Sequence, residues 1–202
     1  MKLDLVALVA IPSLLSLVAC GAAPPPAAQL APESASTTPP SSTTPPPAAA
    51  AGDGKMIVVP LVAKSGSHLS GEATFTQVPG GVKVMIRVAG APPGKIATHV
   101  HETGDCSAPD AKSAGGHFTP TSHQHGLPPG PERHLGDLGN IDIAADGSGS
   151  KEITVSGATL KDGDPASFAG KAIIVHEKVD DGGQPVGNAG GRIGCGVIRG
   201  AS

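Results

Sequence analysis

Apolar and polar residues alternate along the chain from about residue 55 onwards, and this alternation predicts strands. In the segment Val82–Val88 every second residue is Val or Ile, so the apolar side chains fall on one face. Similar short apolar segments recur between glycine-rich turns. We predict eight strands, over Lys55–Ala63, Leu69–Val78, Val82–Val88, Ala97–Glu102, Leu138–Ala144, Lys151–Val155, Ala172–Glu177 and Arg192–Ile198.

The strand pattern favours an all-β domain. No long helical period competes with it, and Trp and Tyr are absent, so Val, Ile, Ala and Leu must fill the core. Many short strands with glycine-rich turns are typical of an antiparallel sandwich or flattened barrel. Two long segments, 103–137 and 178–191, have no strand pattern. Because long loops in a compact domain are usually functional, we expect the chemistry to lie there.

The first quarter of the chain lacks this alternation. An apolar run over Leu5–Val18 follows Lys2 and is too short to span a bilayer, which is typical of an export signal. The residues Leu17–Cys20 resemble the lipobox of bacterial lipoproteins, which implies cleavage before Cys20 and lipidation of that residue. An ordinary secretory signal is the alternative. The segment Gly21–Gly54 is almost entirely Pro, Ala, Ser and Thr, which predicts a disordered tether.

These patterns divide the chain into a lipoprotein signal peptide over 1–19, the lipidated Cys20 with its tether over 20–54, and a β domain over 55–202. A lipidated Cys20 predicts an exported protein that is anchored in a membrane at a bacterial periplasm or cell envelope.

The net charge of −3, with no basic run interleaved with aromatic residues, argues against a nucleic-acid partner.

Histidines are concentrated in the second half of the chain. Of eight, all but His68 lie from His99 onwards. His99 and His101 stand two apart on a predicted strand, so both project from one face and can bind one ion, although such a pair alone could equally be two surface histidines. The loop that follows supplies three imidazoles and a carboxylate, a set that suits tetrahedral zinc: His117, His125, His134 and Asp137.

Two later segments complete a recognisable pattern. His176 ends a predicted strand, and Gly187–Arg192 precedes Cys195. With the earlier histidines in the same order and at similar spacing, the region from about 56 to 200 resembles the copper/zinc superoxide dismutases. The resemblance implies an eight-stranded antiparallel Greek-key barrel or sandwich, immunoglobulin-like. It also implies an enzyme that converts superoxide to oxygen and hydrogen peroxide by cycling copper between Cu(II) and Cu(I).

The resemblance assigns roles to individual residues. It makes His99, His101, His117 and His176 the copper ligands, and His117, His125, His134 and Asp137 the zinc ligands, with His117 bridging the two ions. Four imidazoles suit Cu(II), and the mixed nitrogen and oxygen set suits zinc.

Further roles lie outside the ligand sets. The resemblance implies that Asp180 accepts hydrogen bonds from His99 and His125, the alternative being a solvated loop acid. It makes Arg192 and His117 catalytic: Arg192 would bind the superoxide anion and His117 would supply a proton. A purely structural role for Arg192 is the alternative. Residues 55–202 carry thirteen basic and fourteen acidic side chains, so the positive charge that attracts superoxide must be local.

The remaining candidates are cysteines and two unassigned histidines. The resemblance pairs Cys106 with Cys195 in a disulfide, with two free buried thiols as the alternative. His68 and His123 have no place in the pattern and are expected at the surface, although accessory metal binding at His123 is an alternative. The sequence leaves a homodimer open. A non-enzymatic copper- or zinc-binding protein is the alternative function.

Overall fold

A computed structural model describes residues 54–200. The predicted signal peptide, Cys20 and nearly all of the predicted tether lie outside the described residues. Within residues 54–200, no helix is long and apolar enough to cross a membrane.

The predicted strands are all present. Their ends differ from the predicted ones by three residues at most, the largest difference being at the start of the fourth strand. The strands are β1 (Met56–Ala63), β2 (Ser70–Val78), β3 (Gly81–Ala89), β4 (Gly94–His101), β5 (Asp137–Ile143), β6 (Gly149–Ser156), β7 (Ala172–His176) and β8 (Arg192–Val197).

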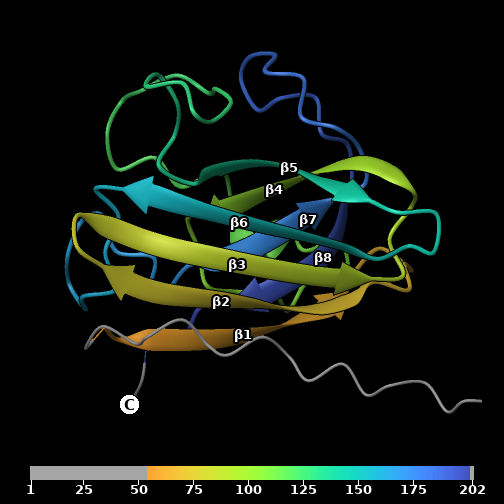
Figure 1. Cartoon of the computed structure of the whole chain (residues 1–202), viewed down its shortest axis with the longest axis horizontal. Helices are drawn as coiled ribbons and strands as arrows, with labels where there is room; N and C mark the ends of the chain where they lie inside the picture. The colour runs from red at the N-terminus through yellow and green to blue at the C-terminus, as the bar shows by residue number, and fades with distance from the viewer. Residues whose placement is uncertain (1–53, 201–202) are drawn as a thin grey trace, which may run out of the picture. The chain divides into compact units, whose positions relative to one another are not determined.

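The eight strands close into an antiparallel barrel (Figure 1) in the order β1-β2-β3-β6-β5-β4-β7-β8. β3 pairs with β6 rather than with β4, the next strand along the chain, and β4 pairs with both β5 and β7. This order is a Greek-key arrangement. Each strand has a paired neighbour on both sides, with the shortest pairings between β5 and β6 (one residue pair) and between β1 and β8 (two residue pairs). The predicted all-β Greek-key barrel is therefore confirmed.

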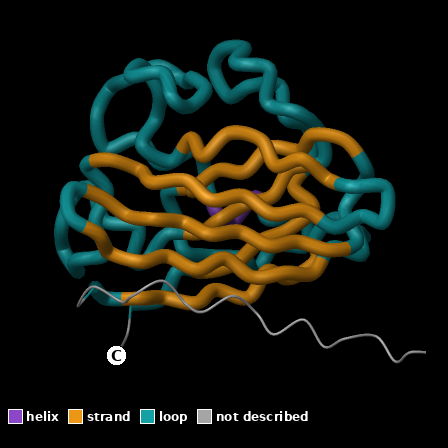
Figure 2. The backbone as a smooth tube through the Cα atoms, viewed as in Figure 1, coloured by secondary structure: helices purple, strands orange, loops and turns teal. Residues whose placement is uncertain are grey.

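Alternation of burial explains why these segments form strands. In β1 the residues Ile57, Val59 and Leu61 point into the barrel, while their neighbours face outward. In contrast, β4 from Ile96 to its end and all of β7 are buried on both faces. Parts of the two long loops, 102–136 and 177–191, project from the same side of the barrel (Figure 2).

The three phenylalanines of the chain link the core to the first long loop. Phe168 packs edge-to-face against both Phe75 and Phe118, with ring centroids 6.0 Å apart in each case. Phe118 directly follows His117, so the core holds the loop at the point where a candidate ligand lies. The same loop carries a short 3-10 helix, Lys112–Ala114, which the sequence did not predict because three residues are too few to show a period.

Candidate metal centre

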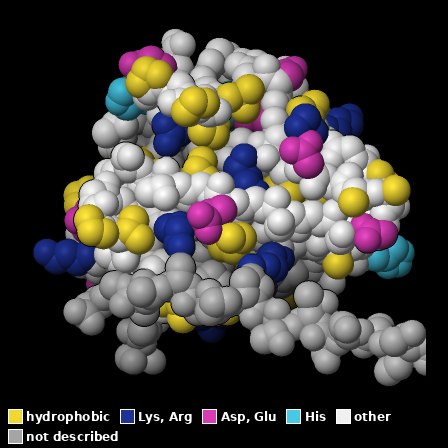
Figure 3. Space-filling model, in the orientation of Figure 1, with side chains coloured by type: hydrophobic (Ala, Val, Ile, Leu, Met, Phe, Trp, Pro, Cys, Tyr) yellow, Lys and Arg dark blue, Asp and Glu magenta, His cyan; other side chains and the backbone are white. Residues whose placement is uncertain are grey.

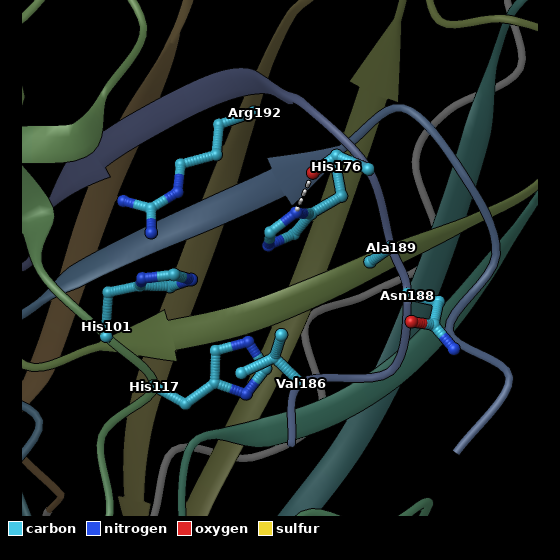
Figure 4. A pocket seen from close by; sticks show the side chains of 9 residues that line it. His101, His117, His176, Val186, Asn188, Ala189 and Arg192 are labelled. Carbon is cyan, nitrogen blue, oxygen red and sulfur yellow. Dashed lines mark hydrogen bonds between the residues drawn. The ribbon is translucent and has the colours of Figure 1, made fainter. Parts of the chain in front are cut away.

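Four histidines converge at one end of β4 and β7. His99, His101, His117 and His176, here called the four-histidine cluster, each offer a ring nitrogen within 4.8 Å of the others. β4 carries the first two, β7 ends at the last, and His117 forms an isolated bridge with His101. In Figure 4 His101, His117 and His176 face a common space.

Only one nitrogen of each imidazole is used by the protein. The outer nitrogens are hydrogen-bonded: His99 Nε2 to Asp180 Oδ2 (2.8 Å), His101 Nδ1 to the Gly115 carbonyl (3.0 Å) and His176 Nδ1 to the Gly190 carbonyl (3.5 Å). The inner nitrogens of the same three rings are buried and have no partner among the described residues. Since buried polar atoms are normally paired, three converging free nitrogens fit a metal ion.

Burial also keeps these imidazoles neutral. It lowers the pKa of His99 to about 4, with the hydrogen bond that His99 donates to Asp180 partly opposing the shift. It lowers the pKa of His101 to about 2 and that of His176 to about 3. At neutral pH the inner nitrogens therefore carry lone pairs, the form that binds a metal.

A second group lies on the other side of His117. His117, His125, His134 and Asp137, here called the mixed cluster, also offer ligand atoms within 4.8 Å of one another. Asp137 Oδ1 lies 3.0 Å from His117 Nδ1 and 3.5 Å from His134 Nδ1, and its Oδ2 lies 3.0 Å from His125 Nδ1. Three imidazoles and one carboxylate form a donor set that zinc accepts in tetrahedral geometry.

The Asp137 carboxylate is held in place by backbone donors. Its Oδ2 accepts hydrogen bonds from the N–H groups of Gly126 (3.1 Å) and His134 (2.8 Å). Burial alone would raise the pKa of Asp137, but the bonds from His117 and Gly126 hold it below its ordinary value. The group is therefore ionised and supplies a negative charge to the mixed cluster.

His117 belongs to both clusters. Because its Nδ1 faces Asp137 and His134, its Nε2 is the atom left for the four-histidine cluster, and its ring centroid lies 4.0 Å from that of His99. The backbone after it is fixed to β4, since Phe118 N–H donates to the Val100 carbonyl at 2.8 Å. The position of the shared imidazole is thus set by the barrel rather than by the free loop.

Asp180 links the two clusters through hydrogen bonds to one histidine of each. Its Oδ2 accepts from His99 Nε2 at 2.8 Å and its Oδ1 accepts from His125 Nε2 at 2.9 Å, with all three side chains buried. Burial opposes the charge, but the bonds from His99 and Gly182 N–H hold the pKa of Asp180 well below its ordinary value. One buried carboxylate therefore accepts from an imidazole of each cluster.

Asn140 on β5 fixes the backbone of Asp180 through a reciprocal pair of bonds, donating to its carbonyl at 2.9 Å and accepting from its N–H at 2.7 Å. Sequence reasoning missed this residue. The predicted strand Leu138–Ala144 also contains Asp142, so an asparagine there was no distinctive signal.

Arg192 lies beside the four-histidine cluster. It opens β8 directly across from His176, and its guanidinium donates to the carbonyls of Ala111 (2.8 Å) and Gly115 (2.7 Å). A cavity of about 380 Å³ is lined by Arg192 together with His101, His117 and His176. Figure 4 shows the guanidinium extending over the same space as the three imidazoles. An anion that entered this cavity would meet the guanidinium and the cluster together.

The disulfide between Cys106 and Cys195 is present, with the two Cα atoms 5.9 Å apart, so this prediction is confirmed. It ties the start of the first long loop to β8. Lys64 reinforces the connection, since its Nζ donates to the carbonyls of Cys106 and Ala108. The loop held in this way contains both carbonyl groups that anchor Arg192.

The two unassigned histidines lie outside both clusters. His68 and His123 are exposed, and His123 Nδ1 lies 3.0 Å from Glu132 Oε2. On the face shown in Figure 3, basic and acidic side chains are interspersed and hydrophobic ones form separate groups. No field of one sign covers that face.

The family model described as copper/zinc superoxide dismutase (SODC) matches residues 69–198. The chain belongs to the copper/zinc superoxide dismutase family. Copper and zinc are the cofactors that this family implies, and the two donor sets fit them.

Curated relatives agree with the family assignment. A protein of Caulobacter vibrioides named superoxide dismutase [Cu-Zn] is 43% identical over 136 residues, which is 64% of this chain and 78% of the relative. One of Aquifex aeolicus named superoxide dismutase [Cu-Zn] 2 is 40% identical over 136 residues, with the same coverage of both chains.

Solved structures share the barrel. A SOD-like protein from Bacillus subtilis is 33% identical with a TM-score of 0.62, covering 70% of this chain and 97% of that one. The clock protein EA4 is 34% identical with a TM-score of 0.66, covering 76% of this chain and 99% of that one. Both of these structures therefore share the fold with this chain over nearly their whole length.

Proposed function

We propose that this chain is a superoxide dismutase in which the four-histidine cluster binds copper and the mixed cluster binds zinc. The observation that carries the proposal is the set of buried, unpartnered inner nitrogens on His99, His101 and His176, next to a cavity that Arg192 lines. Family membership supports the same activity. Bound copper supplies a Cu(II)/Cu(I) couple through which two superoxide anions become oxygen and hydrogen peroxide, and zinc supplies charge without redox change.

Arg192 is the residue that receives the substrate. Its two hydrogen bonds to backbone carbonyls hold the guanidinium at the cavity, and its charge attracts and orients a small anion there. Local charge at Arg192 therefore compensates for the slightly negative balance of the domain.

His117 is the residue that handles a proton. Formation of peroxide requires two protons, and His117 lines the same cavity as Arg192. When it is not bound to a metal, its Nε2 would hold one proton there and pass it to the anion that Arg192 holds. Asp137 fixes the opposite nitrogen of the ring at 3.0 Å, so the imidazole keeps its orientation during this exchange.

The decisive experiment measures superoxide decay in the presence of the full chain loaded with copper and zinc. We expect strong acceleration, and its loss in His101→Ala, which removes one four-histidine ligand but leaves the mixed cluster intact. Zinc content serves as the control, because it should be unchanged in this variant. A copper-loaded chain whose electron paramagnetic resonance spectrum shows four nitrogen ligands, but which does not accelerate decay, would indicate a non-enzymatic metal-binding protein.

The proposal also covers the cellular localisation of the protein. A lipidated Cys20 would anchor the enzyme in a membrane at a bacterial periplasm or cell envelope, where it would remove superoxide outside the cytoplasm. The support is the sequence Leu17–Cys20 at the end of an apolar run. We expect Cys20→Ser to move the protein from the membrane fraction to the soluble fraction, and unchanged membrane association would refute the anchor.

A homodimer is also proposed. Of the six exposed large apolar side chains among residues 54–200, three lie on β1, namely Met56, Val58 and Val62. A second copy would bury this strip and remove it from water. Light scattering coupled to size exclusion should give twice the chain mass for the wild type and the single mass for Val58→Asp. A monomeric wild type would rule the dimer out.

A further inference from the structure

The mixed cluster has its own opening to solvent. A cavity of about 140 Å³ is lined by residues that include His123, Arg133 and His134, and it shares no lining residue with the cavity at Arg192. The mixed cluster therefore borders this second cavity at His134, in addition to the cavity at Arg192, which it borders only through the shared His117. A metal ion can reach the mixed cluster without passing the position where Arg192 lies.

His134 is the member of the mixed cluster that faces this opening. Its side chain is 12% exposed, whereas those of His125 and Asp137 are wholly buried and that of His117 is 4% exposed. An ion that enters through this opening thus meets His134 before the other ligands of the mixed cluster. The remaining three ligands lie behind it.

Two side chains near this opening have no role in either cluster. His123 Nδ1 lies 3.0 Å from Glu132 Oε2, and the two side chains are 43% and 77% exposed. One imidazole and one carboxylate at this separation are a donor pair that zinc uses, with water completing the coordination. Each also lies two residues before a ligand of the mixed cluster: His123 before His125, and Glu132 before His134.

We propose that His123 and Glu132 form an outer capture site for Zn²⁺, from which the ion passes to His134 and then into the mixed cluster. The inference rests on the proposed assignment of zinc to that cluster. Transfer is an exchange of ligands with no change of oxidation state. It runs inward because the mixed cluster offers four protein ligands, whereas the outer pair offers two.

Charge alone does not explain capture at this opening. Glu132 carries a negative charge and the adjacent Arg133 a positive one, with Arg133 Nη1 donating to the Gly130 carbonyl at 2.9 Å. The two charges offset each other, so a cation is held by direct bonds to His123 and Glu132 rather than by a general field. The substitution of either ligand should therefore remove the effect.

The experiment follows metal entry rather than catalysis. Metal-free full chain with its disulfide intact is mixed with Co²⁺ in a stopped-flow instrument, and the visible bands of tetrahedral cobalt report arrival in the mixed cluster. We expect His123→Ala and Glu132→Gln each to slow arrival roughly tenfold, and the double variant to be no slower than either. The final intensity of the bands and the affinity of the mixed cluster for Co²⁺ should be unchanged. A site on the path changes the rates of entry and exit by the same factor, so the binding equilibrium stays the same.

Matched controls separate capture from folding. His68→Ala removes an exposed histidine elsewhere and should load at the wild-type rate. Extraction of zinc by a chelator should slow in His123→Ala by the same factor as entry. Wild-type loading rates in His123→Ala and Glu132→Gln would overturn the capture site, as would a loss of final affinity, which would indicate a structural role. Absence of tetrahedral bands in the wild type would instead refute the zinc assignment itself, and the capture site with it.

Discussion

Gly187 packs directly against Asp180. A Cβ atom added to Gly187 would lie 2.0 Å from Asp180 Oδ1 and 2.7 Å from His125 Nε2. The loop after β7 therefore closes over the hydrogen bond between these two residues only because position 187 has no side chain. The φ of +76° at Gly187 is a second reason for glycine there.

We expect Gly187→Ala to lower the affinity for both metals by about ten- to a hundredfold, because Asp180 orients a ligand in each cluster. Competition with chelators measures this. Gly163→Ala is the matched control: Gly163 has a φ of +78° but no atom within 4 Å of an added Cβ, so it adds strain without a clash. Equal losses of affinity in the two variants would show that strain alone is responsible.

Asp180→Asn tests the carboxylate itself. An amide has a single acceptor oxygen, so it cannot accept from both His99 and His125 as Asp180 does. We expect reduced affinity for both metals, by about tenfold or more, in isothermal titration of the metal-free chain. The neighbouring exposed Asp181, which bonds Asn188, provides the control Asp181→Asn. If both variants bind as the wild type does, Asp180 is not an orienting residue.

Arg192→Glu tests whether local charge guides the substrate. The reversed charge should slow superoxide decay and weaken or invert its dependence on ionic strength, since the attraction to be screened is lost. Arg192→Lys keeps the charge but not the double contact with Ala111 and Gly115, so we expect an intermediate rate. Arg199→Glu makes the same charge change at an exposed position of the last segment. A rate that falls equally in Arg199→Glu would exclude a specific role for Arg192.

Removal of the disulfide should affect both stability and activity. The Cys106–Cys195 bond closes a span of 89 residues, so the double serine variant should lose about 4 to 5 kcal/mol of unfolding free energy in the chain-entropy description. The freed loop also carries the Ala111 carbonyl that holds Arg192. We therefore expect slower superoxide decay at temperatures where the variant remains folded by circular dichroism. Wild-type rates under those conditions would show that the loop holds Arg192 without the bond.

Patterns over a few consecutive residues predicted the features of this molecule that are set by residues close together in the sequence. The period of two in β3 and the paired His99 and His101 are such patterns, and both lie where the sequence indicated. Assignment of the whole ligand set needed the family resemblance, because His101 and His176 are brought together by the pairing of β4 with β7.

Contacts between distant segments left no such signal. Asn140 holds Asp180 across 40 residues, and Gly187 is required only because the folded loop returns to Asp180. The separate opening at His134 depends on how two parts of one loop pack. No period or spacing in the sequence encodes these arrangements.

The metal-free protein should lose stability as the pH falls below neutrality. Burial lowers the pKa values of His99, His101 and His176 to about 4, 2 and 3, whereas in the unfolded chain they lie near 6.5. Between these limits the unfolded state binds more protons, so each histidine stabilises the fold above pH 6.5 and that contribution is lost as the pH falls towards the folded-state value. The loss is on the order of 1 kcal/mol per pH unit for each histidine.

Thermal unfolding of the metal-free chain between pH 7 and 4 tests this. We expect a steep fall in Tm, and a shallower one in His101→Gln, because glutamine does not titrate and His101 has the largest shift of the three. His68→Gln is the control, since its side chain is exposed and should leave the slope unchanged. An identical slope in His101→Gln would mean that burial of this imidazole does not set the acid sensitivity in this pH range, and the other two buried imidazoles, His99 and His176, would have to account for it.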